Sequence, residues 1–458
     1  MTITSVARDT PRLPAGHHER LSAGRAVRAE LPRRALAELS HGTRDPLGII
    51  EAQNSTRLQD LVPIRTQRMS ESPFAFYRGT AAIMAADLAN EPHSGILVPS
   101  CGDAHVANFG FYASPQRTLL FDLNDFDEAG WAPWEWDLKR LVASLVIAGQ
   151  ATERDERVVR RSVVTAVKSY AFAMRIASTA PPLQRYYTHF EAAAGTGRMD
   201  PESRRVLDRA IKHARKNTEQ RAARKLTQMD ETGTLRFIPR PPTTVPLDPE
   251  LRSLQQELVD RYLRTVTTDI NLQMQHYTAV DSIRRVVGVG SVGTRCTLTL
   301  FQDGDENAFI LQSKEAGPSV LEQYGGIEQP ATLTRLTEEQ GHGGRVVAMQ
   351  RILQAVSDPF LGSLQYSGED FGAFDLYVRQ FRDMKGGIDV ETVDDAPFVT
   401  YAQACGVTLA RAHAQAPNAA EVSGYLGRGG RAGAALYEWA LAYAQQSLAD
   451  YEAFIAAQ

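Results

Sequence analysis

Cysteine is scarce in this chain of 458 residues, which holds Cys101, Cys296 and Cys405 at scattered positions. Three separated cysteines form neither a disulfide framework nor a zinc site. Long apolar runs are also missing, because no segment has the uninterrupted length of a membrane span. The N-terminus lacks the apolar core of a signal peptide. We therefore expect a cytoplasmic protein that has no membrane partner.

An excess of charge of either sign is missing as well, since the formal net charge is only −4. The whole chain therefore gives no argument for nucleic acid or a membrane surface as a partner. Hydrophobic residues make up 43% and charged residues 23%, which are ordinary values for a globular protein with a large core. By length alone the chain would hold roughly three domains, and a two-lobed enzyme with a tail fits equally well.

Acidic and amide residues recur between two apolar runs in the segment 95–130. Asp103, His105 and Asn108 follow the run GILV in a short loop, and Asp125 and Asp127 follow the alternating run TLLFDL. Phosphoryl transfer needs a carboxylate that orients a hydroxyl, an amide oxygen that binds a hard cation, and a second carboxylate that bridges this cation to phosphates. The segment is the predicted catalytic region.

The loop at residues 101–108, CGDAHVAN, resembles the H-G-D-x-H-x-x-N loop of aminoglycoside and choline kinases. The resemblance implies that Asp103 orients the acceptor, with His105 and Asn108 beside it. It also implies that Asn108 and Asp125 are metal ligands, that Asp127 holds a second ion, and that Asp137 ties the loop to the following helix. Asp122 is a competing metal candidate. Cys101 stands where the pattern has histidine, so the sequence leaves open which residue supports the loop from beneath.

A glycine-rich stretch later in the chain, VGVGSVGTR, contains Gly288, Gly290, Ser291 and Gly293. The pattern G-x-G-x-x-G alone is weak, but in a dinucleotide-binding fold it opens a helix. Here the residues after it alternate as a strand, turn at Gly304 and return as a second strand that ends near Lys314. This layout is typical of a kinase loop over ATP phosphates, with Lys314 on the third strand. Three turn glycines in an unrelated hairpin are the alternative.

The lysine of such a site needs a carboxylate to hold it. Glu322 is the first choice for this partner, with Glu315 and Glu328 as alternatives.

Arginines cluster among aromatic residues before the catalytic region, at Arg65, Arg68 and Arg78. They could bind an anionic substrate, or they could pair with local carboxylates and stack on aromatic rings. A second basic cluster lies on a helix predicted from Pro201 onward, around Lys212. Aromatic residues that would stack on bases are missing there, so nucleic acid is the less favoured partner.

The motifs of a kinase-like enzyme are all present, but the catalytic loop precedes the glycine-rich loop, and the predicted helix 398–413 comes last. This order is that of a circular permutation, which preserves the core when the new ends lie at the surface. The stretches SPFAFYRG, CGDAHVANFG, FDLNDFDE and YVRQFRDMKG also resemble the bacterial domain-of-unknown-function 2252 family. That family implies no substrate.

We therefore expect an α+β, circularly permuted protein-kinase-like fold with a small β-rich nucleotide lobe and a larger, mostly helical lobe. The expected parts are a flexible basic arm at 1–44, a helical lobe at 45–268, the nucleotide lobe at 269–392 and returning helices at 393–458. The expected function is phosphoryl transfer from ATP, with Mg²⁺, to a small-molecule hydroxyl or amine. Transfer of AMP to a protein, nucleotide sensing without turnover, and nucleic-acid association through the basic helix remain alternatives. The sequence leaves the oligomeric state open.

Overall fold

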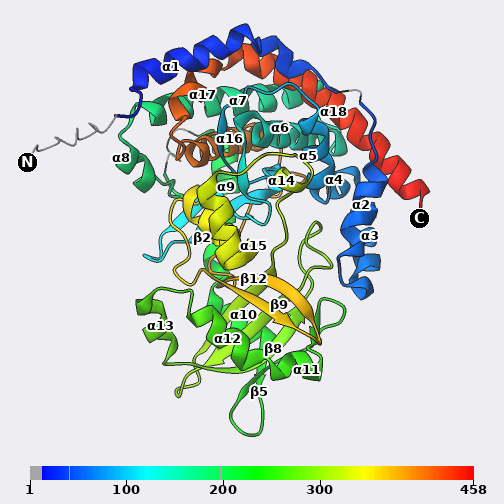
Figure 1. The fold of residues 1–458 in the computed structure, drawn as a ribbon, viewed down its shortest axis with the longest axis vertical. Helices are drawn as coiled ribbons and strands as arrows, with labels where there is room; N and C mark the ends of the chain where they lie inside the picture. The colour runs from blue at the N-terminus through cyan, green and yellow to red at the C-terminus, as the bar shows by residue number, and fades with distance from the viewer. Residues whose placement is uncertain (1–12, 41, 195–196, 198) are drawn as a thin grey trace, which may run out of the picture.

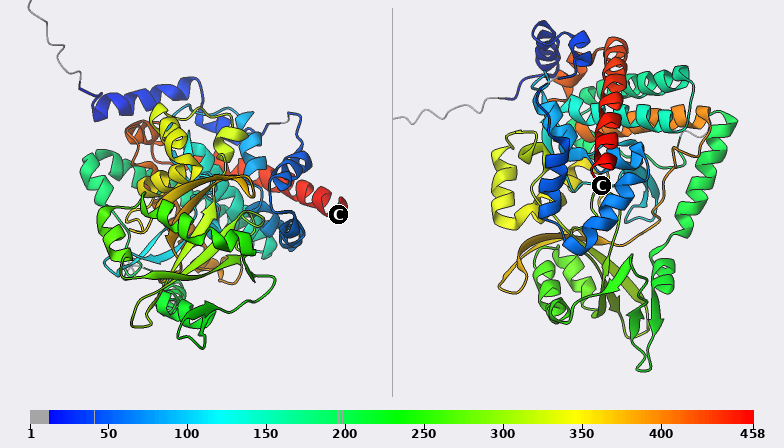
Figure 2. Two further views of the ribbon diagram at one scale, coloured as in Figure 1. Left: turned by 60° about the horizontal axis from the view of Figure 1, so that its bottom comes forward. Right: turned by 90° about the vertical axis from the view of Figure 1, so that its right-hand side faces the viewer.

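Most of the long helices gather at one end of the molecule and the main sheet lies at the other in the computed structural model, which describes residues 13–40, 42–194, 197 and 199–458 (Figure 1, Figure 2). The fold is therefore mixed α+β, as predicted. None of the helices in these residues is long and apolar enough to cross a membrane.

The main sheet of the described residues has six antiparallel strands in the order β11-β12-β10-β9-β8-β7. Their bounds are β7 Thr244–Pro246, β8 Thr278–Arg285, β9 Cys296–Gln302, β10 Ala308–Glu315, β11 Gly362–Gly368 and β12 Gly372–Gln380. The alternating pattern predicted the β9 and β10 hairpin, and the structure confirms it. In β10, Lys314 pairs with Cys296 of β9 on one side and with Tyr377 of β12 on the other.

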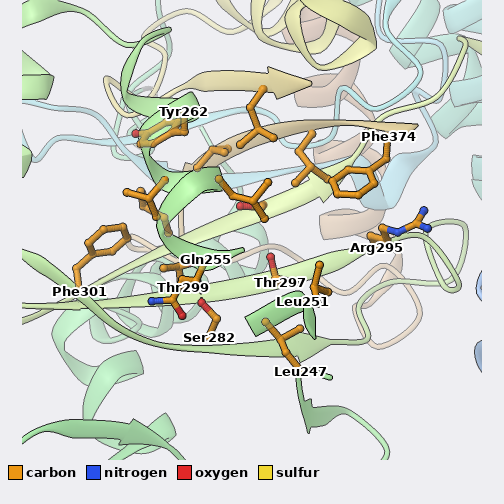
Figure 3. A pocket seen from close by; sticks show the side chains of 17 residues that line it. Leu247, Leu251, Gln255, Tyr262, Ser282, Arg295, Thr297, Thr299, Phe301 and Phe374 are labelled. Carbon is orange, nitrogen blue, oxygen red and sulfur yellow. Dashed lines mark hydrogen bonds between the residues drawn. The ribbon is translucent and has the colours of Figure 1, made fainter. Parts of the chain in front are cut away.

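Side chains alternate between the two faces of the sheet, so neighbouring residues of β10 have different surroundings. Ser313 and Leu311 face the helix α12 (Gln255–Leu263), which leaves a small cavity of about 60 Å³ against the strands. Figure 3 shows Thr297 and Thr299 of β9 near this helix. Lys314 points to the opposite face, where the large cleft described below lies.

Short strand pairs in the helix-rich end hold the loops of the predicted catalytic region. β1 (Leu97–Ser100) pairs with β4 (Gly130–Pro133), and β2 (Phe109–Ala113) pairs with β3 (Leu119–Leu123). Residues 101–108 therefore leave the end of β1, and Asp125 lies two residues after the end of β3. A third pair, β5 (Thr227–Met229) with β6 (Leu235–Phe237), lies beside the main sheet.

Long helices form the core of the helix-rich end. Helix α6 (Trp134–Ala151) is buried along almost its whole length, and α7 (Glu156–Thr179) buries the predicted apolar stripe from Val159 to Met174. Helices α16 (Asp395–His413) and α18 (Gly430–Ala456) pack against α7. The other helices are α2 Pro46–Ser55, α3 Val62–Ser70, α4 Pro73–Arg78, α5 Ala81–Ala89, α8 Pro182–Tyr187, α9 Pro201–Lys216, α10 Glu219–Leu226, α11 Pro249–Ser253, α13 Thr268–Met274, α14 Val320–Gln323, α15 Ala331–Leu353 and α17 Ala419–Leu426.

The N-terminal segment differs from the predicted flexible arm. Residues 17–26 form helix α1 (His17–Ala26), which packs against α17. Arg28 donates hydrogen bonds to the carbonyl oxygens of Gly424 and Tyr425, and Leu36 is fully buried. The few large apolar residues of this segment are thus enough to anchor it, because they meet helices from the other end of the chain. Residues 1–12 and 41 of the predicted arm lie outside the described residues.

The predicted boundary at residue 268 lies too late in the chain. β7 lies in a proline-rich stretch of the predicted helical lobe, yet it forms an edge of the main sheet. Tyr262 of α12 and Phe237 of β6 belong to the apolar clusters that cover the sheet. The sheet-rich part therefore recruits residues from about α10 onward. Proline is compatible with an edge strand because only one side of that strand is hydrogen-bonded.

Close backbone contact between α16 and α7 generates a stability prediction. A Cβ atom at Gly406 would lie 2.3 Å from the carbonyl oxygen of Ala166. We expect Gly406→Ala to lower the free energy of unfolding by about 1–3 kcal/mol, because overpacking outweighs the gain in helix propensity. Thermal or urea unfolding measures this change.

Gly430→Ala in α18 is the matched control, since its added Cβ would meet only the Lys168 side chain, at 4.0 Å. It should leave stability unchanged or slightly higher. Equal destabilisation by both substitutions would contradict the α16–α7 packing described here.

Candidate functional site

The glycine-rich loop, residues 288–293, connects β8 to β9 at the edge of the cleft. Gly288 has φ of +69° and Gly293 has φ of +95°, which are left-handed values that favour glycine. Gly288 and Ser291 line the cleft, and the Ser291 hydroxyl donates to the carbonyl oxygen of Val287 at 3.2 Å. Gly290 instead lies near the backbone of Arg78, since a Cβ atom added at Gly290 would be 3.4 Å from the Arg78 carbonyl oxygen. The loop is therefore held against the helix-rich end.

Lys314 is the buried cation between the two ends of the molecule, with an exposed fraction of only 2%. Its Nζ lies 2.6 Å from Asp127 Oδ2 and 3.5 Å from Asp125 Oδ1. A buried ammonium group is unfavourable unless it is paired. Burial alone would lower the pKa of Lys314, but the carboxylates of Asp125 and Asp127 raise this pKa well above its ordinary value. The structure thus brings together residues that lie far apart in the sequence.

Asp125 and Asp127 have different environments. Asp127 accepts hydrogen bonds from Lys314 and from the hydroxyl of Tyr377, so its oxygens are engaged. Burial and the negative charge of Asp125 raise the pKa of Asp127. Asp125 lines the cleft, and 37% of its side chain is exposed. Burial opposes its ionisation, yet Lys314 and Arg379 hold the pKa of Asp125 well below its ordinary range. Asp125 is therefore an ionised carboxylate that faces the cleft.

The acid that holds Lys314 is not the one first chosen from the sequence. Glu322 lies exposed on the short helix α14, and Glu328 is also exposed. Glu315 instead binds Arg295, with 2.8 Å between the side-chain atoms. The anchor comes from the acidic segment itself, through Asp127. Helix α15, which packs on β11 and β12 behind the strands, contributes Arg345, whose guanidinium group donates to the carbonyl oxygen of Asp127.

The catalytic-type loop, residues 101–108, is fixed from below by a buried carboxylate. Asp137 of α6 accepts hydrogen bonds from the backbone nitrogens of Cys101 at 2.7 Å and Gly102 at 3.0 Å. His413 of α16 contacts the same carboxylate at 3.1 Å, and its other ring nitrogen lies 2.7 Å from the Tyr170 hydroxyl. The imidazole beneath the loop thus comes from His413, whereas Cys101 occupies the position that is histidine in the motif. Sequence reasoning missed His413, although it ends the apolar face of the predicted helix 398–413.

Asp103, His105 and Asn108 lie together in this loop. Asp103 Oδ1 accepts from Arg140 Nε at 2.8 Å, and its Oδ2 lies 3.7 Å from His105 Nε2. Burial lowers the pKa of His105 to about 4, so its ring is neutral near pH 7. The Asn108 amide nitrogen donates to the carbonyl oxygen of Asp103 at 2.7 Å, which directs the amide oxygen away from the loop. Asn108 lines the cleft.

The cleft between the two ends of the molecule has a volume of about 890 Å³. That volume is in the range of small-molecule and cofactor sites. Cations outnumber acids along its wall. The basic residues are Arg68, Arg78, Arg117, His213, Arg285, Lys314, Arg379, Arg382 and Lys385, and the acidic residues are Asp125, Asp358 and Asp383. Such a wall attracts anionic ligands.

The remaining candidates separate into cleft residues and structural residues. Arg68 and Arg78 line the cleft, and Arg68 also donates to the carbonyl oxygen of Gly288. Arg65 is buried and binds Asn54, Gln53 and the carbonyl oxygen of Gly79, so it does not reach the cleft. Asp122 is buried as well and accepts from the backbone nitrogen of Ala355 at 2.9 Å, which commits it to the fold.

Comparison with known proteins gives one match. The model of the family described as "Uncharacterized protein conserved in bacteria (DUF2252)" matches residues 57–457. No curated protein and no solved structure matches the chain.

Lys385 generates a prediction of its own, because it is open to solvent yet surrounded by the cleft walls. The cleft walls around the side chain limit its hydration, and this desolvation together with the charge of Arg379 lowers the pKa of Lys385 to about 7. An ordinary lysine, with a pKa of about 10.4, is almost fully protonated at neutral pH and reacts slowly with acylating reagents. At about pH 7.5 we expect Lys385 to be acylated at least ~10-fold faster than exposed Lys212 of α9, as mass spectrometry of the labelled protein would measure.

The rate at Lys385 should fall as the pH drops below about 7, when its amine becomes protonated. Equal rates at Lys385 and Lys212 between about pH 6 and pH 9 would contradict the lowered pKa.

Proposed function

The chain belongs to the bacterial DUF2252 family, whose description names no activity, and from its site we propose a phosphotransferase that uses ATP and Mg²⁺. The acceptor is a small molecule with a hydroxyl or amine group. The observation that carries the proposal is the contact of Lys314 with Asp127 and Asp125 in the cleft that Asn108, Gly288 and Ser291 also line. An ATP phosphate site needs a lysine, a glycine-rich loop and acidic residues that line the same cleft.

The arrangement of the elements supports a permuted kinase-like fold. Counted from β8, the chain runs through the glycine-rich loop, the strand of Lys314, helix α15, strands β11 and β12, and then α16. The catalytic-type loop, the β2–β3 hairpin and Asp125 would follow if the N-terminal part were attached after α16. This is the order of motifs in protein kinases. His413 at the end of α16 already contacts Asp137 beneath the catalytic-type loop, which favours the same connection.

The donor groups suit a Mg²⁺ ion that is shared with phosphates. The described residues contain no cluster of three or more His, Cys, Asp or Glu side chains that could hold a metal alone. Mg²⁺ in phosphotransferases commonly binds one or two carboxylates, substrate phosphates and water. Asp125 and the amide oxygen of Asn108 would supply the protein ligands, and the ion would neutralise charge on the phosphoryl group. Asp127 is committed to Lys314 and Tyr377, so we assign it to positioning rather than to a second ion.

The other side chains have roles that follow from their contacts. Lys314, held by Asp127, would contact the phosphates beneath Gly288 and Ser291. Asp103 would orient the acceptor, and the Arg140 guanidinium group fixes the direction of its carboxylate. Neutral His105 fills the space behind Asp103. Electrostatic stabilisation does the main work in such a site.

AMP transfer to a protein remains a second candidate, because one observation favours it. The connection between β12 and α16 carries Arg382 and Lys385 where a kinase-like orientation would place the adenine ring. A basic wall suits phosphates better than a base, so a reversed nucleotide fits there. Transfer of the α-phosphate would follow from that orientation.

Binding of ATP with Mg²⁺ is the first outcome to measure. A ligand at about 100-fold excess over its Kd stabilises the folded state by about 2.7 kcal/mol, which raises the Tm. We expect Asp125→Ala to abolish this shift, because it removes the cleft-facing carboxylate. Glu322→Gln is the matched control and should retain the full shift, since Glu322 is exposed on α14. Equal loss in both variants, or no shift in the native protein, would exclude this nucleotide site.

Transfer is tested with ATP labelled at the α or the γ position, incubated with cell extract separated into small molecules and proteins. We expect the γ label in the small-molecule fraction. Asp103→Asn should reduce this labelling by about 100-fold or more while ATP binding persists, because the carboxylate serves the acceptor. Asp208→Asn on the exposed face of α9 makes the same chemical change outside the cleft and should have no effect. Label from the α position on protein would instead favour AMP transfer. Transfer of neither label, despite ATP binding, would favour nucleotide sensing without turnover.

A further inference from the structure

The cleft has a basic end formed by Arg285, Arg379, Arg382 and Lys385. Arg285 ends β8, Arg379 lies in β12, and the other two residues belong to the connection 381–387 that follows β12. Among the described residues, no carboxylate lies within 4.0 Å of any of these four cations. The basic end is thus a group of like charges on one wall.

The four cations are close enough to repel one another. The guanidinium carbons of Arg285 and Arg382 lie 5.1 Å and 5.5 Å from the centre of the Phe381 ring. Burial and the charge of Arg382 lower the pKa of Arg285. Like charges that share a partly desolvated site are unfavourable unless an anion compensates them. Arg285 Nε is also buried and has no hydrogen-bond partner in the structure.

Asp125 compensates only part of this charge, through its attraction to Arg379 and Lys385, and the other nearby carboxylates are engaged elsewhere. Asp383 pairs with Arg117. Asp358 accepts from the backbone nitrogens of Phe360 at 2.8 Å and Gln380 at 2.6 Å. Asp125, which faces the cleft, lies within ion-pair distance of Lys314. The excess of positive charge therefore belongs to the basic end itself.

The backbone of the connection is held in an unusual conformation at this place. Arg382 has φ of 47° and Met384 has φ of 49°, which are left-handed values that are unfavourable for residues other than glycine. Hydrogen bonds from Met384 N to the carbonyl oxygen of Asn217 and from Ala113 N to that of Asp383 fix the connection. The fold thus positions Arg382 and Lys385 at the cleft at a conformational cost, as is typical of ligand sites.

We propose that the basic end binds a multiply charged anionic group with the chemistry of a diphosphate or triphosphate. Guanidinium groups bind phosphate oxygens in pairs. Lys385 is only partly protonated near pH 7, and it becomes a point charge when a bound anion raises its pKa. The site is separate from the cleft-facing carboxylate of Asp125, and its binding of an anion does not require transfer. The anion is either the phosphate chain of the nucleotide in the reversed orientation or a phosphorylated acceptor, and only this choice rests on the proposed function.

Metal-free tripolyphosphate is the probe, titrated into the full chain with EDTA present and followed by calorimetry. We expect the double substitution Arg382→Gln with Lys385→Gln to weaken binding at least ~10-fold, because each lost cation removes charge-assisted contacts. Arg209→Gln with Lys212→Gln on the exposed face of α9 removes the same charge elsewhere and should change affinity less than ~2-fold. The Tm of each variant, measured without ligand, verifies that it is folded.

Two arms distinguish the source of the anion. Loss of ATP affinity in the Arg382 and Lys385 double variant, with adenosine binding unchanged, assigns the anion to the nucleotide. Tripolyphosphate binding that persists in the presence of saturating Mg²⁺ and a non-hydrolysable ATP analogue assigns it to the acceptor. No binding of tripolyphosphate, or equal loss in both double variants, would overturn the proposal. Asp125→Ala should leave metal-free tripolyphosphate binding intact, so failure of the nucleotide site and failure of the anion site give different results.

Discussion

The ammonium group of Lys314 is the point at which the strand-rich and helix-rich ends of the molecule depend on each other. It comes from β10, whereas Asp125 and Asp127 come from the segment after β3. Buried ion pairs add little net stability, because desolvation offsets their attraction. Removing one partner is costly, however, since an unpaired charge stays buried. The contact therefore fixes position: it holds the sheet, and with it the glycine-rich loop, at one place against the acidic segment.

The cleft that results has two electrostatic regions. One is the cleft-facing carboxylate of Asp125, which lies beside Lys314, and the other is the basic end around Arg382 and Lys385. Their opposite charges can orient a ligand that carries both a metal ion and additional phosphates. In the reversed orientation of this ligand, its metal ion would face the basic end and its phosphates would face the carboxylate of Asp125. The same division accounts for the pKa of about 7 at Lys385, which desolvation by the cleft walls and the cationic neighbours lower.

Local patterns in the sequence predicted the parts of the fold that depend on nearest neighbours. The alternation after Gly293 predicted β9 and β10 and placed Lys314 on the third strand of the group, and apolar spacing predicted α7. Contacts between distant segments were not predictable in this way. Asp127 rather than Glu322 holds Lys314, and His413 supports the loop in which Cys101 replaces the histidine of the motif. A single sequence shows which residues can pair, but not which of them the fold brings together, and the same limit explains why helix α1 was predicted as an arm.

A structure of the protein with Mn²⁺ and a non-hydrolysable ATP analogue tests the central claim most directly. The account predicts an anomalous scattering peak bound by Asp125 and Asn108, with Lys314 Nζ in contact with a phosphate oxygen and still held by Asp127. Phosphates beneath the glycine-rich loop or at the basic end would decide the orientation of the nucleotide. Mn²⁺ and nucleotide bound outside this cleft, with Lys314 in contact only with the two carboxylates, would contradict the account.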